Sequence, residues 1–409
     1  MGENEEEKPN VKIVKEKTEK KYLMENPSLE KLLNDNKLEE IAVNGPEEPV
    51  FVFHRDHGRC ETNLEMKEKD IFDFIVDVTE KSTNYINKSK PFLDSKLSDG
   101  SRLNATIPPA TPKGPTITIS KFRERAFSII DLIENGTLSS EAAAFLWTAV
   151  EGEINYPLNI LIIGGTGAGK TTTLNTLMNF VPRRERIACI EDTLELNFFG
   201  RDNLVRMATV PPTKSNKPIE MKDLLVNALR MRPDKIVVGE VRGEEAKTLF
   251  NAMNVGHSAI GTLHANSTKE LKSRLTNPPM SVPRNMLSLI DIVVVQKKII
   301  KNGEIRRRIS SITEVSRSEV GASFNDLFIY DESKDKIERT DTPSRKLERI
   351  ANLSESSFRD IQNQIDDKRR FLEKLLEKDI KRLEKTDEKI QDYYSVKYMD
   401  SDKKVKINN

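Results

Sequence analysis

Residues 164–171 have the spacing of a phosphate-binding loop, G-x-x-x-x-G-K-T. Glycines let the backbone turn its N–H groups toward phosphate oxygens, and a helix that follows adds partial positive charge there. We expect Lys170 to reach the β- and γ-phosphates of ATP and the Thr171 hydroxyl to bind Mg²⁺. The alternative is a glycine-rich turn without a ligand, and the complete motif argues against it. The residues expected to contact nucleotide are Gly164, Gly165, Thr166, Gly167, Ala168, Gly169, Lys170, Thr171 and Thr172.

Carboxylates and a histidine follow three later apolar runs. Glu191 and Asp192 come after Ile187–Ile190, Glu240 follows Ile236–Gly239, and His264 follows Ala259–Leu263. Because the carboxyl ends of parallel strands meet at one edge of a sheet, we expect these side chains to gather around the phosphate loop.

These residue types suit hydrolysis of a nucleotide. A glycine, Gly239, stands where most phosphate-loop enzymes have a metal-binding aspartate, so Glu240 is expected to hold Mg²⁺ through water or to orient the attacking water. Glu191 and Glu195 are candidates to polarise that water. His264, with His257 at the start of the same strand, could sense the γ-phosphate. Taken singly, each also fits an ordinary surface or hydrogen-bonding role; taken together, they favour catalysis.

The elements that must position these residues follow a βαβ rhythm, which predicts an α/β fold with a parallel sheet covered by helices on both faces. A small α+β domain is expected before it, with an Asp99-Gly100 hairpin turn. Apolar residues at helical spacing predict a helical region at the C-terminus. The expected segments are a charged arm, partly helical, with a helix at 1–36, the α+β domain at 37–135, a helical linker at 136–155, the ATPase domain at 156–335 and the C-terminal helices at 340–409.

Composition narrows the class of protein. Charged residues make up 32% of the 409-residue chain and the net charge is +1, so no general basic excess favours nucleic acid. Two cysteines give no disulfide framework, and no apolar run approaches a membrane span, so a cytoplasmic location is expected. Any membrane role is then expected to come through a partner.

Longer runs resemble the type II/IV secretion ATPases, hexameric motors of pili and secretion systems. LRMRPDKIVVGEVRGEEA and TLFNAMNVGHSAIGTLHAN carry this resemblance. EIAVNGPEEPVFVFHR, DGSRLNATIPP, AAFLW, IEDTLEL and RLTNPPMSVP are similar to the archaellum motor ATPase and its archaeal pilus relatives. The resemblance covers roughly residues 37–400.

The resemblance implies a RecA-like ATPase domain joined by a mobile linker to an N-terminal domain, with ATP between them. Arginines from both domains then close over the phosphates: Arg102 from the N-terminal domain, and Arg206, Arg230 and Arg232 from the ATPase domain. It also implies a homo-hexamer at the inner face of the cell membrane. Its expected partners are a polytopic membrane platform protein and accessory archaellum or pilus motor proteins.

Some positions depart from the family pattern. Ser120 and Val210 stand where arginines are common, and Ser258 replaces an aspartate. The acidic, glycine-rich segment after Pro211-Pro212 is replaced by TKSNKPIE. The missing arginines could slow hydrolysis, so a weakly hydrolysing ATP-binding ring is one alternative. A pilus or secretion ATPase is another, and a nucleic-acid translocase, hinted at only by Lys214 and Lys217, is less favoured.

Overall fold

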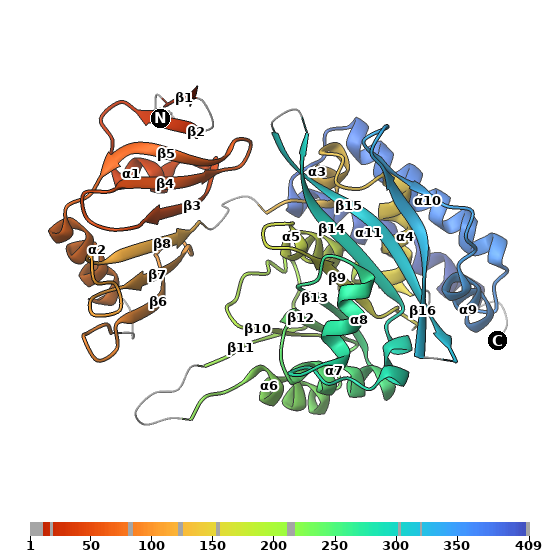
Figure 1. Cartoon of the computed structure of the whole chain (residues 1–409). Coiled ribbons are helices and arrows are strands. Elements are labelled where there is room, and N and C mark those ends of the chain that lie inside the picture. The colour runs from red at the N-terminus through yellow and green to blue at the C-terminus, as the bar shows by residue number, and fades with distance from the viewer. Residues whose placement is uncertain are drawn as a thin grey trace. The chain divides into compact units, whose positions relative to one another are not determined.

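The computed structural model describes residues 11–405 apart from 17–18, 81–84, 122–125, 153–155, 211–216, 302–303 and 320 (Figure 1). The chain divides into two compact units. One comprises residues 1–125 with 300–306, and the other comprises 126–299 with 307–409. Each unit is therefore described by itself.

The first unit is built on a sheet of strand order β1-β2-β5-β4-β3-β8-β7-β6. Its alternating burial, for example in Gly58–Glu65, reflects a sheet with one face packed on a core. The predicted turn at Asp99-Gly100 joins two antiparallel strands, as expected. The elements are β1 (Val11–Glu16), β2 (Glu19–Met24), α1 (Leu29–Asn34), β3 (Leu38–Val43), β4 (Pro49–His54), β5 (Gly58–Glu65), α2 (Glu68–Glu80), β6 (Phe92–Lys96), β7 (Arg102–Thr106) and β8 (Thr116–Ser120).

The prediction of a solvated, partly helical arm is wrong for β1 and β2. These strands pair antiparallel with each other, and β2 runs parallel to β5. Tyr22 is 1% exposed, and its hydroxyl donates a hydrogen bond to the carboxylate of Asp35. A few apolar side chains among the charges are enough to add this hairpin to a sheet edge, because backbone pairing does not depend on the charged side chains.

The second unit contains a sheet of order β11-β10-β12-β13-β9-β14-β15-β16-β17. The pairs from β11 to β14 are parallel, as predicted, whereas β15, β16 and β17 pair antiparallel. This antiparallel extension was not predicted. The strands are β9 (Ile160–Gly164), β10 (Ile187–Glu191), β11 (Leu204–Ala208), β12 (Lys235–Val241), β13 (Ser258–Leu263), β14 (Ile292–Lys301), β15 (Glu304–Ser318), β16 (Gly321–Asp331) and β17 (Lys336–Arg339).

Helices cover both faces of the parallel part. Along β9, Ile160 and Ile162 enter one buried cluster, while Leu161 and Ile163 enter the other. Because successive side chains of a strand point to opposite faces, these two clusters are the cores above and below the sheet. The helices are α3 (Ile129–Glu134), α4 (Ser140–Glu151), α5 (Lys170–Leu177), α6 (Met221–Ala228), α7 (Glu245–Asn254), α8 (Thr268–Thr276), α9 (Arg345–Leu353), α10 (Phe358–Glu377) and α11 (Leu383–Val405), with single 3₁₀ turns at Met178–Phe180, Leu229–Met231 and Arg284–Leu289.

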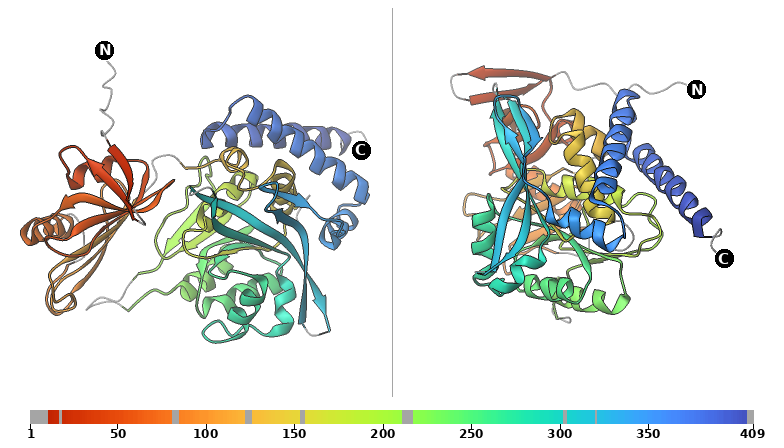
Figure 2. Two further views of the ribbon diagram at one scale, coloured as in Figure 1. Left: turned by 45° about the horizontal axis from the view of Figure 1, so that its top comes forward. Right: turned by 90° about the vertical axis from the view of Figure 1, so that its right-hand side faces the viewer.

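The segment predicted as a helical linker does contain a helix, α4, and this helix lies in the core. All residues from Ala142 to Glu151 of α4 are buried. Trp147 stacks on Phe180 with ring centroids 4.9 Å apart, and its indole N–H donates to the Tyr394 hydroxyl of α11 at 2.6 Å. The C-terminal helices thus pack on the same core as α4 (Figure 2). No helix in the described ranges is both long and apolar enough to span a membrane.

Candidate nucleotide-binding site

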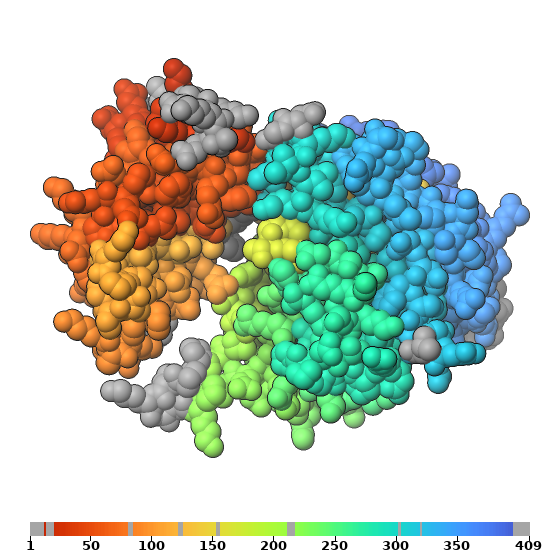
Figure 3. Space-filling view, viewed as in Figure 1, coloured from red at the N-terminus to blue at the C-terminus, as the bar shows by residue number. Residues whose placement is uncertain are grey.

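The phosphate loop lies where β9 ends and α5 begins. Gly167 and Gly169 have φ values of 69° and 97°, which a residue with a Cβ rarely adopts. At Gly164 an added Cβ would lie 2.3 Å from the carbonyl oxygen of Gln296, so only glycine fits. The yellow segment that carries the loop reaches the surface of the second unit (Figure 3), and Thr166 and Gly167 are exposed. The loop therefore has the open, glycine-shaped backbone that phosphate binding requires.

Lys170 begins α5 and folds over the loop. Its ammonium group donates to the carbonyl oxygen of Gly165 at 3.2 Å. Burial lowers the pKa of Lys170, and the charge of Glu240 acts in the opposite direction. The carboxylate of Glu240 therefore lies within electrostatic range of the Lys170 ammonium group. Thr171 and Thr172 follow in the first turn of α5 and are partly exposed.

An irregularity in β12 presents Glu240 at the end of the strand. The register with β13 shifts between Val238 and Val241, which is the signature of a bulge. The Thr262 hydroxyl donates to the carbonyl oxygen of Gly239 at 2.7 Å and holds this bulge in place. A Cβ on Gly239 would lie 3.1 Å from the Cγ atom of Glu191. The glycine that replaces an aspartate here thus leaves room for the neighbouring glutamate.

Glu191 is fully engaged by protein groups, which the sequence did not indicate. It is 2% exposed, and its Oε1 atom accepts from the backbone N–H groups of Glu195 and Leu196 at 2.8 and 2.9 Å. Its Oε2 atom accepts from Arg206 at 3.2 Å, and Arg206 also donates to the Leu196 carbonyl oxygen at 2.8 Å. The geometry favours a role for Glu191 and Arg206 in shaping the 192–196 loop. Glu195 is exposed on that loop.

The two histidines lie at opposite ends of β13. His264 follows the strand, and its Nε2 atom is 3.1 Å from the Thr166 hydroxyl oxygen in the phosphate loop. His257 precedes the strand, and the six residues of β13, which extend over about 20 Å, separate it from His264. The structure therefore brings His264 to the phosphate loop but does not bring His257 there.

Three residues that the sequence did not single out also surround the loop. Gln296, 2% exposed, accepts from the Thr173 hydroxyl at 2.8 Å and so ties β14 to α5. Arg307 of β15 donates from Nε to the carbonyl oxygen of Gly167 at 3.0 Å. The ammonium group of Lys298 lies 3.9 Å from the position of a Cβ on Gly167. In the sequence, only the basic run at 306–308 hinted at Arg307. Its contact with the phosphate loop could not be deduced without knowing how the antiparallel strands pair.

The remaining predicted arginines belong to both units. Arg102, in the first unit, is exposed on β7 and pairs in register with Ser120, one of the positions where an arginine was expected. Arg230 and Arg232 lie at the turn before β12, at the opposite sheet edge from the loop. Val210 is exposed, whereas Pro211, Pro212 and Lys214 lie outside the described residues.

Known proteins resemble the chain in sequence and in fold. The chain is 49% identical over 232 residues to the uncharacterized protein MJ0781 of Methanocaldococcus jannaschii, covering 56% of this chain and 32% of that protein. It is 32% identical over 361 residues to MJ0900 of the same organism, covering 86% of this chain and 64% of the relative. The chain thus spans less than two thirds of the length of either relative.

A solved structure supports the fold. The X-ray structure of the Legionella pneumophila ATPase DotB matches with a TM-score of 0.51 at 18% identity, covering 85% of this chain and 90% of that one. At this level of identity the likeness concerns the fold. The family model described as "Type II/IV secretion system protein" matches residues 23–356, which include the phosphate loop, Glu240 and His264, and the chain therefore belongs to the type II/IV secretion system protein family.

Proposed function

We propose that this protein is an ATPase that hydrolyses ATP to ADP and phosphate and does mechanical work with the energy. The observation that carries the proposal is the gathering of Lys170, Glu240 and His264 around one glycine-shaped loop. Strand ends are common places for polar residues, but a lysine, a carboxylate and a histidine around a complete phosphate motif form a set suited to phosphoryl transfer.

The side chains present suit Mg²⁺ as well as ATP. The Thr171 hydroxyl and the Glu240 carboxylate are hard oxygen donors, and Mg²⁺ commonly takes one or two protein ligands with phosphates and waters for the rest. Among the described residues, no group of three or more histidine, cysteine or acidic side chains could hold a metal by itself, which agrees with a shared site of this kind. When bound, Mg²⁺ supplies charge neutralisation on the phosphates.

Within this site we assign roles to the chain's own groups. The backbone N–H groups of the loop and Lys170 bind the phosphates, and Glu240 orients the attacking water. His264 forms a hydrogen bond with Thr166 and senses whether a γ-phosphate is present. Arg102 of the first unit and Arg206 remain candidates to add positive charge, and Glu195 remains a candidate to polarise the water.

We further propose a homo-hexamer at the inner face of the cell membrane. It would drive the assembly of an archaellum filament through a polytopic platform protein. The same motor would also be able to rotate the filament. The support is the resemblance of the N-terminal runs to archaellum and archaeal pilus motors, together with family membership. An archaeal pilus or type II secretion-like motor is the alternative. A nucleic-acid translocase is disfavoured by the near-neutral charge of the chain.

Steady-state ATP turnover of the full chain tests the proposal, with light scattering in the presence of a non-hydrolysable ATP analogue to measure the oligomer. We expect Glu240→Gln to lower kcat by about a hundredfold or more while nucleotide binding persists. Glu244→Gln is the matched control, because Glu244 is exposed and, among the described residues, its one ion pair is with Lys222 at the surface. Equal and negligible turnover in the wild type and in Glu240→Gln would contradict the motor, and a monomer under all conditions would contradict the ring.

A further inference from the structure

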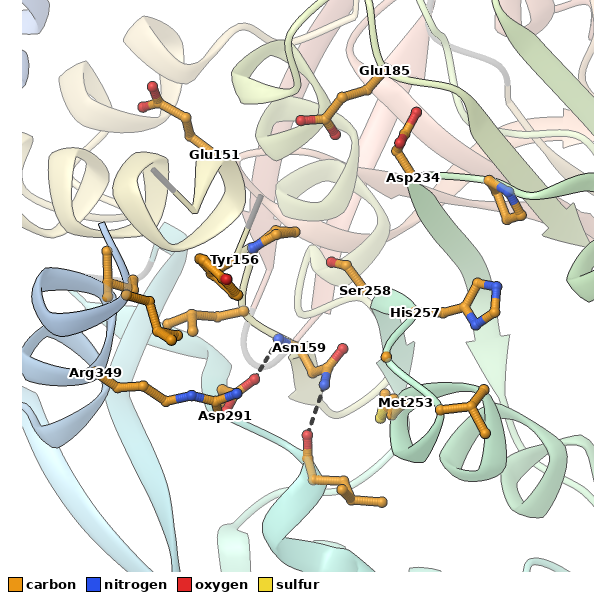
Figure 4. A pocket seen from close by; sticks show the side chains of 18 of the residues that line it. Glu151, Tyr156, Asn159, Glu185, Asp234, Met253, His257, Ser258, Asp291 and Arg349 are labelled. Atoms are coloured by element: carbon orange, nitrogen blue, oxygen red, sulfur yellow. Dashed lines mark hydrogen bonds between the residues drawn. The ribbon is translucent and has the colours of Figure 1, made fainter. Parts of the chain in front are cut away.

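A cavity lies at the amino-terminal ends of the parallel strands in the second unit. The phosphate loop lies at the opposite, carboxyl-terminal ends of these strands. The volume of the cavity is about 800 Å³. Residues that begin or precede five strands line it: Asn159, Glu185, Asp234, His257 with Ser258, and Asp291 (Figure 4). The helices α4 and α9 contribute Glu151 and Arg349. The proposed ATPase function gives this cavity no role.

The carboxylates that line this amino-edge cavity already have charged or polar partners within the protein. Glu151 pairs with the buried Lys368 at 2.6 Å, and Asp291 pairs with Lys346 at 2.6 Å. Glu185 lies 3.5 Å from Lys235, which is 0% exposed. Asp234 accepts from the backbone N–H of Arg186 at 2.7 Å. Each acidic group of the wall therefore already lies beside a lysine or a backbone N–H group of the protein, although the Oε2 atom of Glu185 has no hydrogen-bond partner among the described residues.

Two of the three arginines that line the same wall are different. Within the described part of the chain, neither Arg232 nor Arg349 makes a side-chain hydrogen bond or ion pair. The Nδ1 atom of His257 is buried and also has no hydrogen-bond partner among the described residues. Figure 4 shows the Arg349 side chain extending from α9 toward Asp291, whose charge is already matched by Lys346. The uncompensated charge in this cavity is positive, so it suits a carboxylate or another anion.

Apolar side chains stand exposed around the same cavity. Tyr156, Val255 and Leu353 line it and are 41%, 70% and 40% exposed. A small anion that bound the arginines would leave these three side chains in water. A polypeptide that crosses the rim would cover them and present carboxylates to the arginines in the same contact.

We propose that the amino-edge cavity is a docking site for an acidic segment of a partner protein, in which Asp or Glu residues alternate with apolar residues. The carboxylates of that segment bind Arg232 and Arg349. Its apolar side chains pack on Tyr156, Val255 and Leu353. The site is independent of the nucleotide loop, so a failure of the ATPase proposal would leave it standing.

Selection from a library of random short peptides displayed on phage, with the full chain immobilised, tests this site. We expect the selected peptides to combine Asp or Glu with Leu, Ile or aromatic residues. Fluorescence anisotropy of a selected peptide should show Kd raised about tenfold or more by Arg232→Gln with Arg349→Gln, as expected for the loss of charged hydrogen bonds. The matched control is the double variant Arg230→Gln with Arg345→Gln. Both residues are exposed and do not line the cavity, and they lie two and four positions from the lining arginines in the sequence.

Three results would overturn the proposal. Selected peptides without acidic residues would be one, and equal binding by the lining variant and the wild type would be another. Isothermal titration in which inorganic phosphate binds at these arginines and no peptide does would assign the cavity to a small anion instead. Circular dichroism and thermal unfolding of both double variants establish that they are folded, so that a loss of binding reports on the cavity.

Discussion

The Nε2 atom of His264 lies 3.1 Å from the hydroxyl oxygen of Thr166, although 98 residues separate the two. They meet because β13 and β9 are parallel neighbours whose register pairs Leu263 with Ile163, immediately before both sites. The contact joins a strand end to the most exposed part of the phosphate loop. A histidine in this position is able to respond to whatever the loop binds.

We expect His264→Ala to lower kcat for ATP by about tenfold or more, because a side-chain hydrogen bond to a group near the phosphates is lost. Thr166→Ala should produce a smaller loss. If the contact itself matters, the double variant will lose less than the two single variants combined. Steady-state kinetics of the three variants measures this coupling, and strictly additive losses would argue against it.

Arg307 braces the loop from the antiparallel extension by donating to the Gly167 carbonyl oxygen at 3.0 Å. We expect Arg307→Gln to weaken ATP binding by about tenfold, since the loop loses both a hydrogen bond and a nearby positive charge. Lys297→Gln is the control, because Lys297 is an exposed cation of the neighbouring strand β14. Titration with a fluorescent ATP analogue gives the Kd of both variants. If both substitutions weaken binding equally, Arg307 contributes only its positive charge and not its hydrogen bond to the loop.

The ion pair of Lys368 and Glu151 is buried beside Trp147. Both side chains are at most 1% exposed, and the Lys368 ammonium also donates to the Thr148 hydroxyl at 3.0 Å. Removing one partner leaves an unpaired buried charge, so we expect Lys368→Ala to lower the free energy of unfolding by about 3–5 kcal/mol.

Urea unfolding monitored by fluorescence measures this loss, because Trp147 is the single tryptophan of the chain and lies in the second unit. Arg370→Ala on the same helix is the matched control. Its pair with Asp367 is exposed and should contribute about 1 kcal/mol or less. A loss for Lys368→Ala as small as that of the control would show that the buried pair is dispensable.

Glu270 closes the loop that follows His264. Its carboxylate accepts from the Asn266 backbone N–H at 2.8 Å and from Arg274 at 2.8 Å, and these bonds hold the pKa of Glu270 below its ordinary value of 4.5. Because the folded pKa is the lower one, the stabilisation is present above pH 4.5 and is lost as the pH falls through the folded pKa.

We therefore expect the protection factor of the Asn266 amide against hydrogen exchange to fall as the pH drops below 4.5. Glu270→Gln should remove this pH dependence at that amide, while amides in the buried strand β13 serve as an internal reference. An unchanged pH dependence in Glu270→Gln would assign the effect to another group.

The sequence was informative where local chemistry and strand order suffice. The glycine pattern and the apolar run before it identified the phosphate loop, because only a few backbone paths place N–H groups around a phosphate. The βαβ rhythm predicted that Glu240 and His264 share an edge with Lys170, since parallel strands end together. The C-terminal helices followed from apolar spacing, and Ile361 and Leu372 do enter the core.

Only the tertiary structure decided how these side chains are used. The sequence suggests that the Glu191 carboxylate is available for catalysis. In the structure it accepts hydrogen bonds from two backbone N–H groups and from Arg206. Arg307 and Gln296 reach the loop through strand pairing that local sequence does not encode. The charged strands Val11–Glu16 and Glu19–Met24 join a sheet because pairing depends on backbone groups and on buried side chains such as Tyr22. His257 and Arg232 were grouped with the nucleotide by motif, yet the length of a strand places them at the opposite edge, where both line a different cavity.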